Sequence, residues 1–361
     1  MSERTAATLR TVVRDPFDSE REAVLLRLDD GAENVGWGEA SPLAEYSPDD
    51  IDGASRALDA WAVRWTAGEF GGDGFERTLD LAFVDTDLRG VPSVRCAIDT
   101  AVLDLEARRL GVPLHVVLLG LFEETKVVRS VPVCALVSLQ GVDRPGTPAA
   151  PADVLSDVRH WIAEGFSVVK FKVGGDRGFM EQLDQLRAVR AEFPSLKIRL
   201  DANGSWTPDK ALQRLADLKS AIDPELVEQP VGAIDLLTFM NSPVSLAADE
   251  SLRLSDAVAA VTQPGGCDAV VLKPMVLGGH RACAELAREA LSNGARVIVT
   301  HTFGGKIAHA AACELALAVA AADPVGDPLA AGLAGHDELT QRDGPWIVPS
   351  VEAGHGVEKP W

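Results

Sequence analysis

From about residue 131 onward, short β-branched runs alternate with helical segments, and this rhythm constrains the fold more than any other feature. The strand-like runs lie at 131–137, 167–173, 197–200, 226–227, 244–247, 269–272 and 296–299. Strands that alternate with helices are typical of a parallel sheet covered by its own crossover helices. Because seven such units follow one another, we predict a closed (β/α) barrel of the TIM type rather than an open doubly wound sheet. No GxGxxG motif follows the first run, which argues against a dinucleotide-binding domain.

The residues on either side of the repeat lack this rhythm. Residues 1–126 mix strand-like and helical segments, which predicts a separate α+β domain. We expect the barrel over residues 127–322, and a tail at 323–361, rich in Gly, Pro and Asp, that packs back on the first domain. The run 141–151 holds three prolines and predicts an irregular connection after the first barrel strand.

Composition excludes several classes of function. The chain has 34 basic and 54 acidic residues, a net charge of −20, which argues against binding to nucleic acid or to an anionic membrane surface. Its five cysteines form no CxxC pair, so we expect unpaired, buried thiols in a reducing compartment. No signal-peptide pattern and no bilayer-length apolar run is evident. We therefore expect a cytoplasmic protein, and the sequence makes no prediction of its oligomeric state.

Polar residues stand where the strand-like runs end. In chain order they are Lys170 and Lys172, Asp201 and Asn203, Glu228, then Asp249 with Glu250 and Ser251, Lys273, and His301 with Gly304 and Gly305. Successive groups are separated by about one βα unit, which takes roughly 30 residues. Barrel enzymes carry their chemistry at the carboxyl ends of the strands, so we expect these side chains to ring one mouth.

Three of these residues are carboxylates on neighbouring strands. Without a cation, Asp201, Glu228 and Asp249 would repel one another and raise each other's pKa. Mg²⁺ prefers carboxylate oxygens, and the lack of His or Cys in the set argues against Zn²⁺. We therefore predict a Mg²⁺ site, with Mn²⁺ as a candidate substitute. The alternative for each carboxylate is a helix N-cap or an ion pair. Asn203 either hydrogen-bonds a metal-bound water or shapes the turn.

Three of the strand-end residues are lysines. Lys170 and Lys172 are two residues apart, so their side chains face the same side of the strand. A lysine inside a barrel is costly unless it is paired or functional. Desolvation and a neighbouring cation lower a lysine pKa toward the range of a general base. We predict that the pair Lys170 and Lys172 provides a general base, and that Lys273 faces the pair across the mouth. The alternatives are lysines that reach solvent and, for Lys273, a salt bridge to Asp249 or Glu228.

The end of the last strand-like run is open to two interpretations. His301 has either a second catalytic role or a structural hydrogen bond. Gly304 and Gly305 open a helix, so they either offer backbone N–H groups to a substrate carboxylate or allow close packing.

Together these residues resemble a known family. The motifs Lys-x-Lys at 170–172, Asp-Ala-Asn at 201–203, Glu-Gln-Pro at 228–230, Asp-Glu-Ser at 249–251 and Lys-Pro at 273–274 resemble those of the enolase superfamily. Lysines on both sides of the site place the resemblance in the subgroup of muconate-lactonising-like enzymes. Within it, the segments 36–43, 46–48, 92–95 and 301–306 resemble the o-succinylbenzoate synthases of menaquinone biosynthesis.

The resemblance implies a modified barrel whose mouth is capped by the N-terminal domain, with loops 15–21 and 44–50 nearest the substrate. It also implies a Mg²⁺-dependent loss of water from a small anionic cyclohexadiene carboxylate. Lys172 would take the proton and return it to the leaving hydroxyl, and Lys273 would act as a cation on the opposite face of the ring. N-acylamino acid racemases, dipeptide epimerases and muconate cycloisomerases share this frame and remain alternatives. A non-catalytic metal-binding barrel is the alternative of another class.

Overall fold

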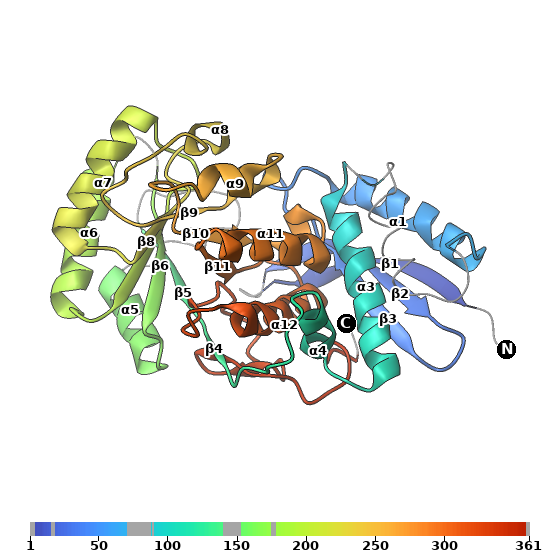
Figure 1. Cartoon of the computed structure of the whole chain (residues 1–361). Coiled ribbons are helices and arrows are strands. Elements are labelled where there is room, and N and C mark those ends of the chain that lie inside the picture. The colour runs from blue at the N-terminus through green and yellow to red at the C-terminus, as the bar shows by residue number, and fades with distance from the viewer. Residues whose placement is uncertain are drawn as a thin grey trace.

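The computed structural model describes residues 4–15, 19–70, 88, 90–139, 153–174 and 178–358. It contains an N-terminal antiparallel sheet with its helices and a curled parallel sheet covered by helices (Figure 1). The predicted barrel and α+β domain are therefore both present. The proline-containing run 141–151 lies outside the described residues, as does part of the loop 15–21.

The N-terminal domain is built on three strands in the order β1-β2-β3, with all neighbours antiparallel. Its elements are β1 (Thr5–Arg14), β2 (Glu20–Asp29), β3 (Val35–Ala40), α1 (Ile51–Thr66), α3 (Pro92–Leu110) and α4 (Leu114–Gly120). Asp50 caps α1 by accepting a hydrogen bond from the Gly53 amide. Helix α3 lies so close to β3 that a Cβ atom on Gly38 would stand 1.8 Å from the Ala97 carbonyl oxygen. The glycines of β3 therefore set the distance between sheet and helix.

Seven parallel strands form the barrel wall in the order β11-β10-β9-β8-β7-β6-β5. They are β5 (Ala135–Ser138), β6 (Val168–Lys172), β7 (Lys197–Asp201), β8 (Leu226–Glu228), β9 (Leu246–Ala248), β10 (Ala269–Leu272) and β11 (Arg296–Val299). The register pairs Lys172 with Asp201, and Asp201 with Glu228. Three of the predicted site residues therefore stand side by side at one end of the sheet.

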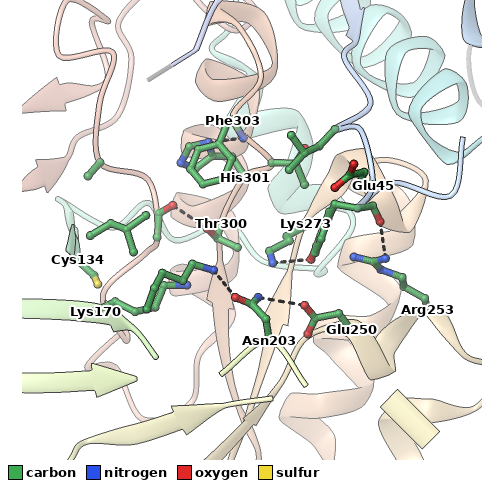
Figure 2. A pocket seen from close by; sticks show the side chains of 17 residues that line it. Glu45, Cys134, Lys170, Asn203, Glu250, Arg253, Lys273, Thr300, His301 and Phe303 are labelled. Atoms are coloured by element: carbon green, nitrogen blue, oxygen red, sulfur yellow. Dashed lines mark hydrogen bonds between the residues drawn. The ribbon is translucent and has the colours of Figure 1, made fainter. Parts of the chain in front are cut away.

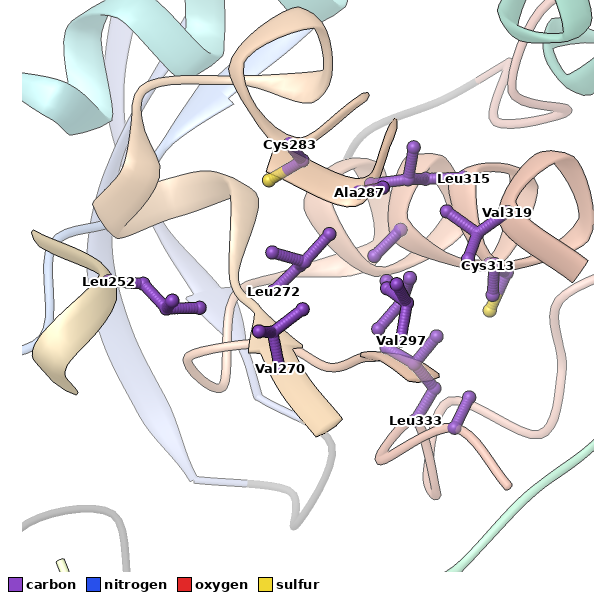
Figure 3. Packing of buried hydrophobic residues seen from close by; sticks show 14 of the residues in the cluster. Leu252, Val270, Leu272, Cys283, Ala287, Val297, Cys313, Leu315, Val319 and Leu333 are labelled. Carbon is purple, nitrogen blue, oxygen red and sulfur yellow. The ribbon is translucent and has the colours of Figure 1, made fainter. Parts of the chain in front are cut away.

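Helices cover the outside of this wall (Figure 1). They are α5 (Val154–Ala163), α6 (Phe179–Glu192), α7 (Pro208–Ile222), α8 (Ala233–Leu236), α9 (Ala257–Val261), α10 (Pro274–Leu277), α11 (His280–Ser292) and α12 (Lys306–Ala322), with the 3₁₀ helix η2 at Glu250–Arg253. Figure 3 shows Leu272 and Val297 from the strands facing Ala287 and Leu315 from α11 and α12. This apolar layer between strands and helices is the main core of the barrel.

Residues beyond the predicted end of the barrel complete its wall. Ala331 forms a parallel bridge with Val133, and Gly332 forms one with Thr300, so this short segment joins the two edges of the seven-stranded sheet. The wall therefore extends past residue 322, the boundary expected from the sequence. The first predicted strand is also divided: β4 (Val131–Pro132) pairs antiparallel with β13 (Trp346–Ile347), which pairs with β12 (Arg342–Asp343), and only β5 enters the barrel.

The N-terminal domain is fixed to the barrel through the starts of two barrel helices. Glu39 accepts hydrogen bonds from the amides of Gly305 (2.6 Å) and Ala308 (3.2 Å) at the start of α12. Asp99 of α3 accepts hydrogen bonds from the amides of His280 and Arg281 at the start of α11. A carboxylate at a helix N-terminus is favoured by the unpaired amides and the helix dipole. These contacts hold the domain over the carboxyl-end face of the barrel.

The five cysteines are buried and unpaired, as predicted. Among the described residues, no helix combines the length and apolar character needed to cross a membrane.

Candidate active site

A cavity of about 350 Å³ opens where the barrel strands end and the N-terminal domain meets them (Figure 2). Its volume lies within the usual range for small-molecule sites, roughly 300–1,000 Å³. Leu43, Glu45 and Tyr46 line it from the N-terminal domain, and the barrel supplies Cys134, Leu136, Lys170, Lys172, Asn203, Glu250, Arg253, Lys273, 300–303, Gly332 and Ala334. The mouth predicted from strand ends is therefore a hollow that both domains form.

On one side of the cavity, two of the predicted lysines, Lys170 and Lys172, contact two of the predicted carboxylates, Asp201 and Glu228. Lys172 Nζ lies 2.7 Å from Asp201 Oδ2 and 3.0 Å from Asn203 Oδ1. Lys170 Nζ lies 3.1 Å from both Asp201 Oδ2 and Glu228 Oε2. Neither lysine reaches out to solvent: Lys172 is 8% exposed, and Lys170 lines the same cavity.

Lys273 stands on the other side. Three strands, β7, β8 and β9, separate β6 from β10, and Lys273 follows β10 directly. The Ala331–Gly332 segment adds an eighth, strand-like member to the barrel wall. Strands β6 and β10 are then four positions apart in either direction around the wall, so they lie opposite one another. Lys273 forms a short ion pair with Asp249, which was one of the alternatives expected from the sequence. The same side chain also lines the cavity, so the ion pair does not remove it from the site.

Burial and mutual repulsion govern the ionisation of the carboxylates. Burial, followed by the nearby Asp201 charge, raises the pKa of Glu228 to about 7. Burial, followed by the Glu250 charge, raises the pKa of Asp249 above its usual value. Burial also opposes ionisation of Asp201, but Lys172 and Lys170 outweigh it and hold the Asp201 pKa below its usual value. The cluster thus holds more negative charge than burial favours, a condition that a bound cation relieves.

The donor set fits a hard divalent cation such as Mg²⁺. Glu228 Oε1 is buried and has no hydrogen-bond partner among the described residues, so it has an oxygen left to ligate a cation. Asp201, Glu228 and Asp249 provide only oxygen atoms, the donors that Mg²⁺ prefers. Within the described part of the chain, no three acidic, His or Cys side chains already form a closed ligand cluster, and a lysine contacts each of these three carboxylates.

The neighbouring polar residues have distinct contacts. Asn203 adopts a left-handed backbone conformation (φ +44°), and its side chain joins Lys172 to Glu250, accepting from the first and donating to the second. It therefore both shapes the turn and orients Lys172. Ser251 is buried: its hydroxyl accepts a hydrogen bond from the Gln229 side chain and donates one to the Ala233 carbonyl. It does not line the cavity.

His301 lines the cavity and also makes a structural hydrogen bond, because its Nδ1 accepts the Phe303 amide at 3.0 Å. Burial, followed by the neighbouring His336, lowers the pKa of His301 well below its usual value. A neutral ring that accepts at Nδ1 carries its proton on Nε2.

The two glycines at the start of α12 do not face the cavity as an open anion site. Glu39 already accepts the Gly305 amide. A Cβ on Gly305 would approach Val13 to 2.8 Å, and one on Gly304 would approach Ala308 to 2.8 Å. Of the two interpretations of Gly304 and Gly305, the structure therefore favours close packing, and the Gly305 amide, which Glu39 already accepts, is not available to a substrate carboxylate.

Three residues of the site were not among the predicted site residues, although Tyr46 and Gln229 lie in the resembling segments 46–48 and 228–230. Tyr46 reaches Lys273 and Asp249 from the N-terminal domain, and Arg253 packs on the Tyr46 ring. Gln229 accepts the amide of Asp249 at 2.9 Å and so holds that residue from behind. Tyr46 did carry a signal, because it is the only tyrosine in the chain, whereas Arg253 carried none.

Comparison with known proteins identifies the family of the chain. Residues 153–359 match the family model "Enolase C-terminal domain-like", and residues 5–103 match "MenC, N-terminal domain". The o-succinylbenzoate synthase of Thermobifida fusca is 31% identical over 83% of this chain and 71% of its own length. The L-Ala-D/L-Glu epimerase of Bacillus subtilis is 27% identical over 85% of this chain and 80% of its own length.

Solved structures share the fold. A substrate-liganded complex of the Bacillus subtilis L-Ala-D/L-Glu epimerase superposes with a TM-score of 0.82 at 23% identity, covering 100% of both chains. A dipeptide epimerase from Methylococcus capsulatus complexed with Mg ion superposes with a TM-score of 0.79 at 23% identity, covering 99% of both chains. With the family model spanning more than half of the residues and the same barrel and cap throughout, the chain belongs to the enolase superfamily, among its enzymes similar to muconate-lactonising enzyme.

Proposed function

We propose that the chain is an o-succinylbenzoate synthase, which removes water from 2-succinyl-6-hydroxy-2,4-cyclohexadiene-1-carboxylate. The main support for this chemistry is that Lys172 and Lys273 lie on opposite sides of the barrel, around one cluster of buried carboxylates. The choice of dehydration rests on the match of residues 5–103 to the MenC N-terminal domain and on the Thermobifida fusca relative.

In this proposal Lys172 is the base and then the acid. Its Nζ atom, held by Asp201 and Asn203, takes the proton next to the substrate carboxylate and returns it to the departing hydroxyl on the same face. Transfer by one group on one face gives a syn elimination. Lys170 keeps a positive charge beside Lys172 through its contacts with Asp201 and Glu228.

Lys273 acts from the opposite face of the ring. Its ammonium group stabilises the developing negative charge and interacts with the ring face as a cation–π partner. Asp201, Glu228 and Asp249 would hold Mg²⁺, which when bound would supply a Lewis acid for the substrate carboxylate.

A second candidate function is dipeptide epimerisation. It is favoured by the L-Ala-D/L-Glu epimerases, which are about as similar to this chain in sequence as the synthases are. An epimerase would use the two lysines on opposite faces of one carbon, and the geometry supports that use as well.

One assay separates the two candidates. The purified protein is incubated with Mg²⁺ in D₂O, in one sample with the cyclohexadiene carboxylate and in another with L-Ala-L-Glu. We expect loss of the diene absorbance and formation of the aromatic product, no turnover in EDTA, and recovery when Mg²⁺ is added. The variant Lys172→Ala should be inactive and folded. Exchange of the dipeptide α-proton without dehydration would refute the synthase assignment in favour of epimerisation.

A further inference from the structure

A single tyrosine from the N-terminal domain, Tyr46, contacts both Lys273 and Asp249 in the candidate active site. Tyr46 lies in the loop between β3 and α1, and its hydroxyl oxygen is 2.7 Å from Lys273 Nζ and 3.2 Å from Asp249 Oδ2. An ammonium group can only donate, so the Tyr46 oxygen accepts from Lys273 and its own proton is available to Asp249. One hydroxyl therefore joins a proposed catalytic cation to a proposed metal ligand across the boundary between the domains.

The tyrosine is held in this position from the barrel side. Arg253 Nη1 donates to the Tyr46 carbonyl at 2.8 Å, and its guanidinium carbon lies 4.1 Å from the ring centroid. Lys273 Nζ lies 4.9 Å from the same centroid. Arg253 ends η2, the turn that begins directly after Asp249. Figure 2 shows Arg253, Glu250 and Lys273 gathered on this side of the cavity.

The loop itself is preformed. The Ser47 amide donates to the Leu43 carbonyl at 2.8 Å, and Ser47 Oγ accepts the Leu43 amide at 2.9 Å. Because these contacts fix the turn without touching the lysine, the hydroxyl of Tyr46 can be tested separately from the shape of its loop.

We propose that Tyr46 is a positioning residue, supplied by the capping domain, whose hydroxyl holds Lys273 and Asp249 in their working arrangement. The inference rests on the roles of Lys273 and Asp249 in the proposed function. It applies to dehydration and epimerisation alike, since both reactions need the second lysine and the cation site at fixed places.

The test compares Tyr46→Phe with the control Ser47→Ala. Tyr46→Phe keeps the ring on Arg253 and removes only the hydroxyl. We expect kcat to fall about 10- to 100-fold, the loss that follows from removing a hydrogen bond to a charged group. KM should change little, and the Kd for Mg²⁺, measured by calorimetry, should rise. Ser47→Ala should keep kcat and Mg²⁺ affinity near those of the wild type.

A spectroscopic readout makes the test independent of turnover, and its Mg²⁺ titration needs no substitution. Because Tyr46 is the only tyrosine, protein grown with 3-fluorotyrosine gives one ¹⁹F resonance from this site. We expect that resonance to shift when Mg²⁺ is added and in the variant Lys273→Met. A resonance that moves in neither case would overturn the proposal, as would a Tyr46→Phe enzyme with normal kcat and Mg²⁺ affinity. Equal losses in Ser47→Ala would also overturn it, because the loop rather than the hydroxyl would then be responsible. A responsive resonance in a protein with no dehydratase activity would refute only the proposed function.

Discussion

From the contact between Glu39 and the start of α12 we predict how much this link between the two domains contributes to the free energy of unfolding. Glu39 is 2% exposed and accepts two backbone amides, those of Gly305 and Ala308, as well as the Ser41 hydroxyl. Each hydrogen bond to a charged acceptor contributes about 1.5–3 kcal/mol. Glu39→Ala leaves both amides unpaired, so we expect the free energy of unfolding to fall by about 3–5 kcal/mol. Glu39→Gln keeps one acceptor oxygen and should cost about 1.5–3 kcal/mol.

Urea unfolding followed by circular dichroism at pH 7.5 measures these differences. The matched control is Glu69→Gln, which removes a charge of the same kind from an exposed ion pair with Arg64. That control should change the unfolding free energy by less than about 0.5 kcal/mol. If Glu39→Gln were as stable as the wild type, the inference that this carboxylate holds the start of α12 would be wrong.

Three further predictions concern the site and the pH dependence of stability. Lys273→Arg keeps the charge but replaces a compact ammonium by a longer planar group, so kcat should fall about 100-fold. If steady-state kinetics gave a normal kcat, the catalytic role proposed for Lys273 would be refuted. Asp249→Asn should weaken Mg²⁺ binding measured by calorimetry, and an unchanged Kd would exclude it as a ligand. Burial lowers the pKa of His280 to about 3, so the folded state resists its protonation. Stability should be constant above pH 6.5 and fall below it by about 1.4 kcal/mol per pH unit for this group, a share that His280→Gln should remove from urea unfolding curves measured between pH 7 and pH 5.

Much of the barrel could be predicted from the sequence because its signals are local. A strand of alternating or β-branched residues and the helix that follows it can be recognised within about 30 residues. The strand ends then name Lys172, Asp201 and Glu228 as neighbours, and the observed register pairs them in that order. The last member of the barrel wall, at residues 331–332, shows what sequence patterns cannot predict. Ala331 and Gly332 make only single bridges, and a segment so short has no periodicity to detect.

What the sequence by itself determined is the set of charged residues at the barrel mouth and the order in which they stand around it. Parallel strands bring their carboxyl ends to one edge, so spacing along the chain becomes position around the ring. The tertiary structure decided which groups complete that ring. Tyr46 reaches Lys273 across 227 residues, and Glu39 reaches Gly305 across 266. Such contacts depend on how one domain docks on the other, and docking is set by the shape and charge of two whole surfaces rather than by any short stretch of sequence.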